Sequence, residues 1–231
     1  MTMFASQWFA NTGILGSNTA NATSTASTAA HTFSDQALGD ADSTRVIAVA
    51  VGMGVNAANR TIDSVTVGGA DLTKRVGAVA SNAGIENFRS EIWSAVIASD
   101  TTADIVVTMS GTIGSNRGVA ISVHRLVGNV LAAPNATAED NDNDGTTDSL
   151  TVSVNTEANG YVVCCGVSFK TAPNTATWSG ATELTDSMTG NIAQTAANHS
   201  TTSKESTRTI TVDFTTGGNV QAAASASWFP A

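Results

Sequence analysis

The chain has 231 residues and a formal net charge of -9, and only 13% of its residues are charged. The acidic balance argues against a nucleic-acid partner, because nucleic-acid binding depends on clustered Lys and Arg. A hydrophobic content of 42% is too high for a disordered chain. The longest apolar run, Val46 to Val55, is about half of the roughly 20 residues that a membrane span needs. We therefore expect a folded protein with no membrane span.

The first 44 residues are predicted to form an N-terminal arm or loop region that could include an edge strand. Ser17 to Thr32 are almost all small and polar, so this stretch can bury little apolar area. Trp8 and Phe9 are large apolar residues that either dock on the domain or reach a neighbouring chain. No basic residue precedes Arg45, unlike the start of a secretory signal, so we expect folding in a reducing cytoplasm.

Residues 45–231 have the pattern of an all-β domain. Apolar residues alternate with polar ones, mainly Thr and Ser, in four segments, at 105–109, 119–123, 150–154 and 210–214. One apolar face and one polar face are typical of antiparallel strands packed on one side. Clusters of Gly, Asn and Asp between these segments have the composition of turns.

A short motif occurs twice, as GGADLT at 68–73 and as SGATELT at 179–185. Each copy follows a long apolar segment and precedes a Thr-rich alternating one. The repetition predicts two pseudo-repeated halves, 45–130 and 150–231. Because an open sheet must bury its apolar face, we expect the halves to form one two-layer antiparallel β-sandwich, jelly-roll-like. Two tandem domains are the alternative.

Three segments carry a family resemblance: IDSVTVGGADLT at 62–73, SEIW at 90–93 and TADIVVTMSG at 102–111. They resemble the SVTxGGxxLT, EIW and TaxVxVTxSG elements of a β-sandwich family found in bacteriophage virion proteins and bacterial surface proteins. The resemblance extends over residues 45–231. Its motifs are mostly turn and packing residues, so it implies the fold more directly than the function, and it gives no catalytic residue.

The segment 139–148, EDNDNDGTTD, is the strongest candidate for a metal site. The candidate calcium ligands are Asp140, Asp142, Asp144 and Asp148. The pattern D-x-D-x-D-G matches the first half of an EF-hand loop, in which alternating carboxylates converge on a hard cation. The twelfth position is Thr151 instead of the bidentate Glu, which excludes a true EF-hand. A looser Ca²⁺ loop and a solvated turn between two strands both remain open.

Other chemistry-bearing residues are scattered along the chain. The histidines, expected to be surface or hydrogen-bonding residues, are His31, His124 and His199. Cys164 and Cys165 are adjacent, so they would point to opposite faces of a strand as two buried hydrophobes.

Carboxylates and tryptophans give the remaining candidates. The carboxylates that could form a glycosidase pair, but are expected to be surface charges, are Glu86, Glu91 and Asp104. Trp178 precedes a turn and is the best candidate for an exposed aromatic, whereas Trp93 and Trp228 are expected in the core. No catalytic or cofactor-binding residue is predicted.

These features favour a non-enzymatic structural protein of a phage virion, a capsid decoration or cement protein that stabilises the capsid surface. Its expected partners are the major capsid protein and further copies of itself, with a trimer as the first oligomer to test. It would be synthesised in the host cytoplasm and displayed on the virion surface. The alternative is a receptor- or carbohydrate-binding β-sandwich module of a tail fibre or cell surface. A hydrolase on a sandwich scaffold is a third class.

Overall fold

The computed structural model describes residues 13–56, 60–82, 86–128, 130–169, 175–189, 191–214 and 220–230. Within these ranges all regular structure is β-strand, and neighbouring strands pair antiparallel. The predicted all-β antiparallel sandwich class is therefore confirmed. The described ranges hold no helix long and apolar enough to cross a membrane.

The strands form four sheets, and each half of the chain supplies an outer and an inner sheet. The first inner sheet has the order β1 (Leu15–Ser24), β9 (Gly118–Val127), β3 (Val46–Val55), β7 (Glu86–Val96), β6 (Thr73–Asn82). The first outer sheet is β2 (Ala30–Ala37), β8 (Thr102–Met109), β4 (Ile62–Val67), β5 (Ala70–Asp71). The second inner sheet is β10 (Ala136–Asp142), β17 (Gln221–Trp228), β12 (Tyr161–Phe169), β15 (Ile192–Ser200), β14 (Thr182–Thr189). The second outer sheet is β11 (Ser149–Thr156), β16 (Glu205–Asp213), β13 (Thr177–Ser179).

The two halves have the same strand order. In the inner sheets β1-β9-β3-β7-β6 corresponds to β10-β17-β12-β15-β14, and in the outer sheets β2-β8-β4 corresponds to β11-β16-β13. The repeated motif lies at equivalent places, since GGADLT joins β4 to β6 and SGATELT joins β13 to β14. The duplication predicted from this motif is thus present in the topology.

The predicted boundaries of the halves are corrected by this correspondence. The first half begins with β1 and β2, which lie in the region expected to be an arm, and the second begins with β10 at Ala136. β1 pairs with β9 and β2 pairs with β8, so both are edge strands of the sandwich. The expected edge strand is therefore present twice, and an arm or loop over Ser17 to Thr32 is wrong for most of that stretch. Residues 1–12, with Trp8 and Phe9, lie outside the described residues.

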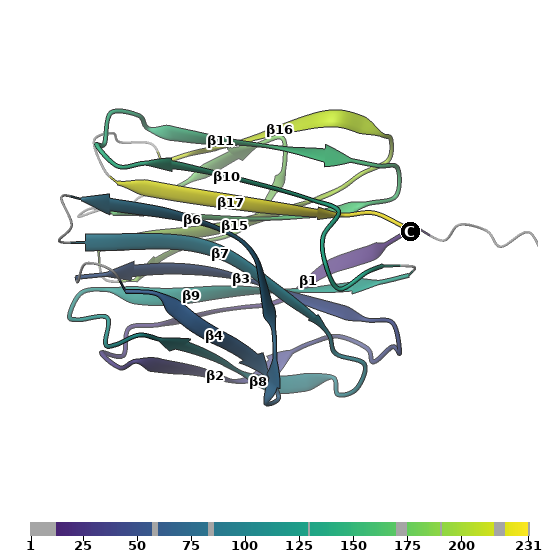
Figure 1. Cartoon of the computed structure of the whole chain (residues 1–231), viewed down its shortest axis with the longest axis horizontal. Coiled ribbons are helices and arrows are strands. Elements are labelled where there is room, and N and C mark those ends of the chain that lie inside the picture. The colour runs from purple at the N-terminus through teal and green to yellow at the C-terminus, as the bar shows by residue number, and fades with distance from the viewer. Residues whose placement is uncertain are drawn as a thin grey trace, which may run out of the picture.

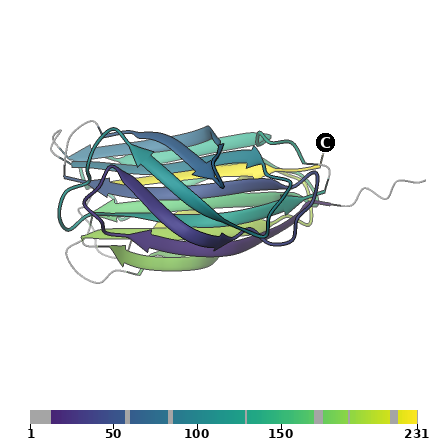
Figure 2. The same ribbon diagram turned by 90° about the horizontal axis from the view of Figure 1, so that it is seen from below.

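The four sheets stack as four layers instead of the two expected (Figure 1). One apolar core lies between the first outer and inner sheets, and another lies between the second pair. Two further clusters lie between the inner sheets. From below, the first outer sheet crosses in front of the other layers (Figure 2). Each half has enough strands for its own two-layer sandwich once β1, β2, β10 and β11 are included. The prediction of two layers for the whole chain was therefore too low.

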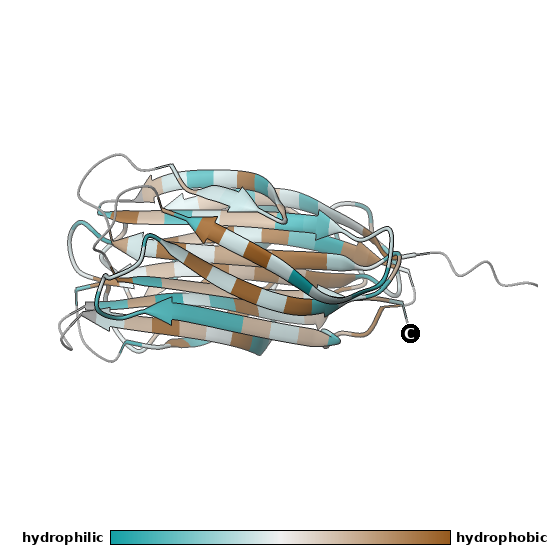
Figure 3. Cartoon of the chain, turned by 90° about the horizontal axis from the view of Figure 1, so that it is seen from above, coloured by the Kyte–Doolittle hydropathy of each residue, from teal (hydrophilic) through white to brown (hydrophobic). Residues whose placement is uncertain are grey.

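Inner and outer strands differ in their burial patterns. All ten residues of β3 and all eight of β17 are buried, because the inner sheets are covered on both faces. In β11 exposed and buried residues alternate strictly, with Ser149, Thr151, Ser153 and Asn155 outward and Leu150, Val152, Val154 and Thr156 inward. Bands of different hydropathy accordingly alternate along the strands seen from above (Figure 3). The large number of Thr residues thus fits the solvent-facing sides of the outer sheets.

Small residues line the interface between the inner sheets. β3 presents Ala48 and Ala50 to this interface, and β17 presents alanines, including Ala224 and Ala226. A Cβ built on Gly54 of β3 would lie 2.3 Å from Cδ1 of Ile192 in β15, so a larger residue there would clash unless Ile192 shifts. Part of the high alanine content is therefore explained by close packing between the halves.

Candidate functional site

The acidic segment 139–148 forms the end of β10 and the turn that leads into β11. Asp142 is buried at its base, and its carboxylate accepts hydrogen bonds from the main-chain N–H groups of Asp144, Gly145 and Thr147 at 2.8–3.0 Å. The Thr147 hydroxyl donates a further bond at 3.1 Å. Desolvation opposes ionisation of this carboxyl, but the hydrogen bonds outweigh it and lower the pKa of Asp142 to about 2.

Two other side chains of this segment bind the free edges of neighbouring strands. Oδ2 of Asp140 accepts the N–H of Thr151 in β11 at 2.8 Å. Oδ1 of Asn143 accepts the N–H of Ser81 in β6 at 2.9 Å, which joins the second half to the first. Edge N–H groups are templates for unwanted strand pairing, and polar side chains that occupy them reduce this hazard. The segment thus has a structural role in capping two sheet edges.

The predicted calcium ligands are not brought together around one point. Asp142 is turned toward the main chain of its own loop, and Asp144 accepts the N–H of Thr146 at 3.1 Å. The main-chain oxygen of Asp148 accepts the N–H of Phe214 at 2.8 Å. In the described ranges, no three His, Cys, Asp or Glu side chains form a group that could hold a metal ion. Calcium binding by the segment stays a prediction.

A chain of polar side chains crosses the interface between the halves. Oγ of Ser122 lies 3.1 Å from Nε2 of His124, and Nδ1 of His124 lies 3.3 Å from the hydroxyl of Tyr161. Nδ2 of Asn198 donates to the same Tyr161 hydroxyl at 2.6 Å. Ser122 and His124 come from β9, whereas Tyr161 and Asn198 come from β12 and β15 of the other half. The contacts fix the two inner sheets in one relative position.

Burial governs the protonation of this network. His124 is fully buried, and desolvation lowers its pKa to about 3, so the imidazole is neutral at neutral pH. Desolvation likewise raises the pKa of Tyr161 well above its ordinary value, although the hydrogen bond from Asn198 opposes this. A neutral imidazole next to a protonated phenol makes an uncharged link between the halves.

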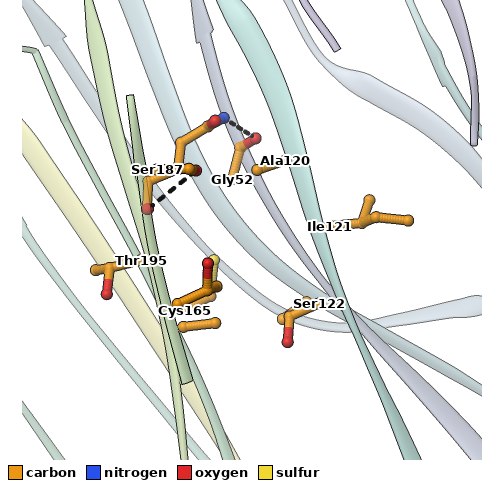
Figure 4. Close-up of a pocket in the computed structure, with 11 residues that line it drawn as sticks. Gly52, Ala120, Ile121, Ser122, Cys165, Ser187 and Thr195 are labelled. Atoms are coloured by element: carbon orange, nitrogen blue, oxygen red, sulfur yellow. Dashed lines mark hydrogen bonds between the residues drawn. The ribbon is translucent and has the colours of Figure 1, made fainter. Parts of the chain in front are cut away.

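A small cavity of about 20 Å³ lies beside this network, between β9 and β3 of one half and β12, β14 and β15 of the other (Figure 4). Its volume suits about one water molecule. Gly52, Ser122, Cys165 and Thr195 are among its lining residues. Nε2 of Gln194 crosses the interface and donates to the main-chain oxygen of Gly52 at 2.6 Å. The space therefore belongs to the packing between the halves.

Glu91 differs most from its prediction as a surface charge, because it is fully buried. Its carboxylate accepts hydrogen bonds from Nε1 of Trp93 at 3.0 Å and from Lys74 and Arg89 at 3.3 Å. A Cβ built on Gly77 of β6 would lie 2.9 Å from Cγ of Glu91, so glycine makes room for the side chain. Glu91 thus holds β6 and β7 together through a buried, paired charge.

The other predicted residues lie apart from one another. Asp104 accepts the main-chain N–H of Asp35 at 2.9 Å, and Glu86 begins β7, where its side chain lies outside the described part. Nδ1 of His31 lies 2.8 Å from Oγ of Ser24 in a buried site, so of the two expected roles His31 has the hydrogen-bonding one. His199 is partly buried on β15.

The predicted burial of the tryptophans and cysteines agrees more closely with the structure. Trp93 and Trp228 are buried as expected. Trp178 is half-buried, and its Nε1 donates to Oγ1 of Thr195 at 2.7 Å. Cys164 and Cys165 are free and buried, and they face different cores on opposite sides of β12.

Comparisons with known proteins add little. No family model matches the chain, and no curated protein matches it. A solved structure titled BspA_C_WT has 11% sequence identity, with 78% of this chain and 75% of that chain covered, and a TM-score of 0.18. A score this low supports no conclusion about fold or function.

Sequence reasoning missed the network between the halves. Ser122 and His124 are two residues apart, which places them on one face of a strand, but nothing in the sequence marks Tyr161 or Asn198 as their neighbours. The pairing depends on how two inner sheets stack. The one available signal was that β9 and β12 carry polar residues on faces that are otherwise apolar.

Proposed function

We propose that this protein is a non-enzymatic structural subunit of a phage virion, a capsid decoration or cement protein. The observation that carries the proposal is that buried ionisable side chains hold the fold together. Arg45 binds main-chain carbonyls, Glu91 joins two strands, and His124 links the halves. A body held together by buried hydrogen bonds of this kind suits a subunit that must withstand mechanical and thermal stress.

Two further features support this reading. The net charge of -9 fits a subunit displayed on the outside of a particle better than one that lines packaged nucleic acid. The SVTxGGxxLT-like, EIW and TaxVxVTxSG-like elements resemble those of virion and bacterial surface proteins. The partners in this proposal are the major capsid protein and further copies of the chain, with a trimer at a capsid three-fold site as the first arrangement to test.

The test is a binding experiment with undecorated capsids. Purified protein is mixed with such capsids, and the bound fraction is measured by co-sedimentation while circular dichroism monitors the fold. We expect saturable binding at a fixed number of copies per capsomer and a higher melting temperature of the capsid. Failure to bind at concentrations where the protein is folded would refute the cement role. Binding to a glycan array instead would favour the receptor-binding alternative.

A further inference from the structure

The interface between the two inner sheets has approximate two-fold symmetry. Because the halves share one strand order, β1, β9, β3, β7 and β6 correspond to β10, β17, β12, β15 and β14. β3 packs on its own counterpart, β12. β6 packs on β10 and β17 (Figure 1), and β14 packs on their counterparts, β1 and β9. Likewise, β7 packs on β17 and β12, whereas β15 packs on β9 and β3. Each contact recurs with the halves exchanged, as in an interface between two identical subunits.

Side chains at equivalent positions repeat this symmetry. Aligning β3 and β12 on their first residues makes Gly54 equivalent to Phe169. Their neighbours in register are Phe88 of β7 and Ile192 of β15, which are therefore equivalent to each other. Ile192 packs directly over Gly54. Phe88 packs on Phe169, with the ring centroids 6.0 Å apart. The same contact is thus made twice, once in each direction across the interface.

Hydrogen bonds across the interface repeat it as well. Ser90 of β7 lies opposite Gly52 of β3, and Gln194 of β15 lies opposite Val167 of β12, so Ser90 and Gln194 are equivalent. Nε2 of Gln194 donates to the main-chain oxygen of Gly52 at 2.6 Å. Oγ of Ser90 donates to the main-chain oxygen of Cys165 in β12 at 2.8 Å. Each half therefore donates to the central strand of the other.

The halves are separate bodies apart from this interface. Each outer sheet shares a core with the inner sheet of its own half, and the other side of each inner sheet is covered by the other half. The chain passes between the halves once, through the connection 128–135. A surface that matches its own counterpart within one chain also matches the same surface on a second copy.

We propose that the inner-sheet face of each half is a dimerisation surface, and that the connection 128–135 makes it pair within one chain. When the connection is too short, two chains exchange halves and form a dimer through the same interface. The partner is a second copy of this chain, because only an inner-sheet face supplies the matching contacts. This inference does not depend on the virion function.

The length of the connection can be compared with the distance that it covers. β10 packs over β6, which lies three strand spacings from β9, about 14 Å, and one layer away, about 10 Å. The connection therefore covers about 17 Å. Nine Cα steps from Val127 to Ala136 reach about 31 Å when extended, whereas three steps reach only about 10 Å. A connection of two residues is thus too short to let the halves of one chain pair.

The test is a change of connection length in the full chain. Deleting Val130 to Asn135 leaves two connecting residues, Gly128 and Asn129. The matched control replaces the same six residues with Gly and Ser, so that it loses the same side chains but keeps the length. A second control deletes only Ala132 and Ala133, which leaves a reach of about 24 Å. Analytical ultracentrifugation measures the mass, at a concentration at which the replacement control is a monomer, and circular dichroism measures the fold. We expect a folded dimer for the six-residue deletion and monomers for both controls.

Thiol reactivity shows whether the dimer uses the inner-sheet faces. Cys165 is buried between the inner sheets, whereas Cys164 is buried in the core of the second half. In a Cys164→Ala background, we expect the Cys165 thiol of the dimer to react with a thiol reagent as slowly as in the replacement control.

Three outcomes would overturn the proposal. A folded monomer for the six-residue deletion would mean that the connection does not decide the pairing. An unfolded or aggregated deletion variant beside folded controls would mean that the faces do not pair between chains. A dimer in which Cys165 reacts rapidly would have formed through another surface.

Discussion

Nδ1 of His124 lies 3.3 Å from the hydroxyl of Tyr161, and this contact joins the two halves of the molecule inside the interface between the inner sheets. Each residue is nearly inaccessible to solvent, so the contact persists only while both side chains are uncharged. Ser122 and Asn198 complete the hydrogen bonding on either side. The interface between the halves should therefore respond to acid.

We predict that stability falls as the pH decreases from about 6.5 toward 3. The folded-state pKa of His124 is about 3 and its ordinary value is 6.5, so between these values the unfolded chain binds a proton that the folded chain does not. Stability should drop by up to about 1.4 kcal/mol per pH unit in this window. Urea unfolding at several pH values measures the slope.

The matched variant for this prediction is His124→Gln, which keeps a polar side chain but removes the titration. It should flatten the pH dependence between 6.5 and 3. Burial also lowers the pKa values of His31 and His199, so part of the slope should remain. An unchanged slope in His124→Gln would contradict the assignment.

The packing at Gly54 gives a second prediction. Gly54→Ala would place a methyl group 2.3 Å from Cδ1 and 2.6 Å from Cγ1 of Ile192, so the Ile192 side chain or the inner sheets would have to shift. We expect a loss of about 1–3 kcal/mol in the free energy of unfolding. Gly52→Ala is the control, because its nearest neighbour, Cγ of Gln194, is 3.4 Å away. Adding Ile192→Ala should make Gly54→Ala less costly than it is alone, and a purely additive loss would argue against the clash.

The features that could be predicted from the sequence are those set by residues that lie close together in the chain. The alternation in 150–154 and the repeated GGADLT and SGATELT turns are enough to predict the strands, the duplication and the β-sandwich class. The segment 17–32 was misread because its small polar residues lack apolar alternation, yet Asn18 binds the Val123 main chain and Ser122 Oγ at 2.9 and 3.0 Å. Hydrogen bonds to a neighbouring strand, which no local pattern records, hold this edge in place.

The same reasoning explains the errors at the candidate site. The spacing of the aspartates in 139–148 predicts metal ligands, but the main partners of Asp140, Asp142 and Asp144 are N–H groups. One of these belongs to β11, and the neighbouring Asn143 accepts an N–H of β6. Glu91 was read as a surface charge because its partners include Lys74, seventeen residues away. Long-range pairing decides both cases, and it becomes visible only when the sheets are assembled.

A third prediction concerns Arg45, a fully buried guanidinium held by main-chain carbonyls. The acceptors are the main-chain oxygens of Leu38, Gly39, Asp40, Ile97, Ser99 and Asp100. Arg45→Met would leave these carbonyls without their donors, and we expect it to cost at least about 3 kcal/mol in urea unfolding. Arg45→Lys should recover only part of the loss, because an ammonium group has three donors and lacks the planar fork.

The control for this site is Arg125→Met, since Nε of Arg125 donates to the same Asp40 oxygen at 2.9 Å from a less buried position. We expect that variant to cost less than about 1.5 kcal/mol. Equal losses for the two arginines would mean that the hydrogen bonds from Arg45 to the 38–40 and 97–100 connections do not contribute more to the free energy of unfolding than the single bond from Arg125.

The fourth prediction separates the structural role of Asp142 from calcium binding. Asp142→Ala removes the acceptor of four hydrogen bonds, so it should destabilise the protein by about 1–3 kcal/mol in the presence of a chelator. Asp144→Ala removes the acceptor of one and should cost less. Because the folded-state pKa of Asp142 is about 2, its contribution to stability should persist from neutral pH down to about pH 4 and disappear as the pH falls through 2.

Melting curves with calcium and with chelator then decide the metal question. A rise in melting temperature with calcium that Asp142→Ala abolishes supports a calcium loop. Identical wild-type curves leave the capping of strand edges as the role of the segment.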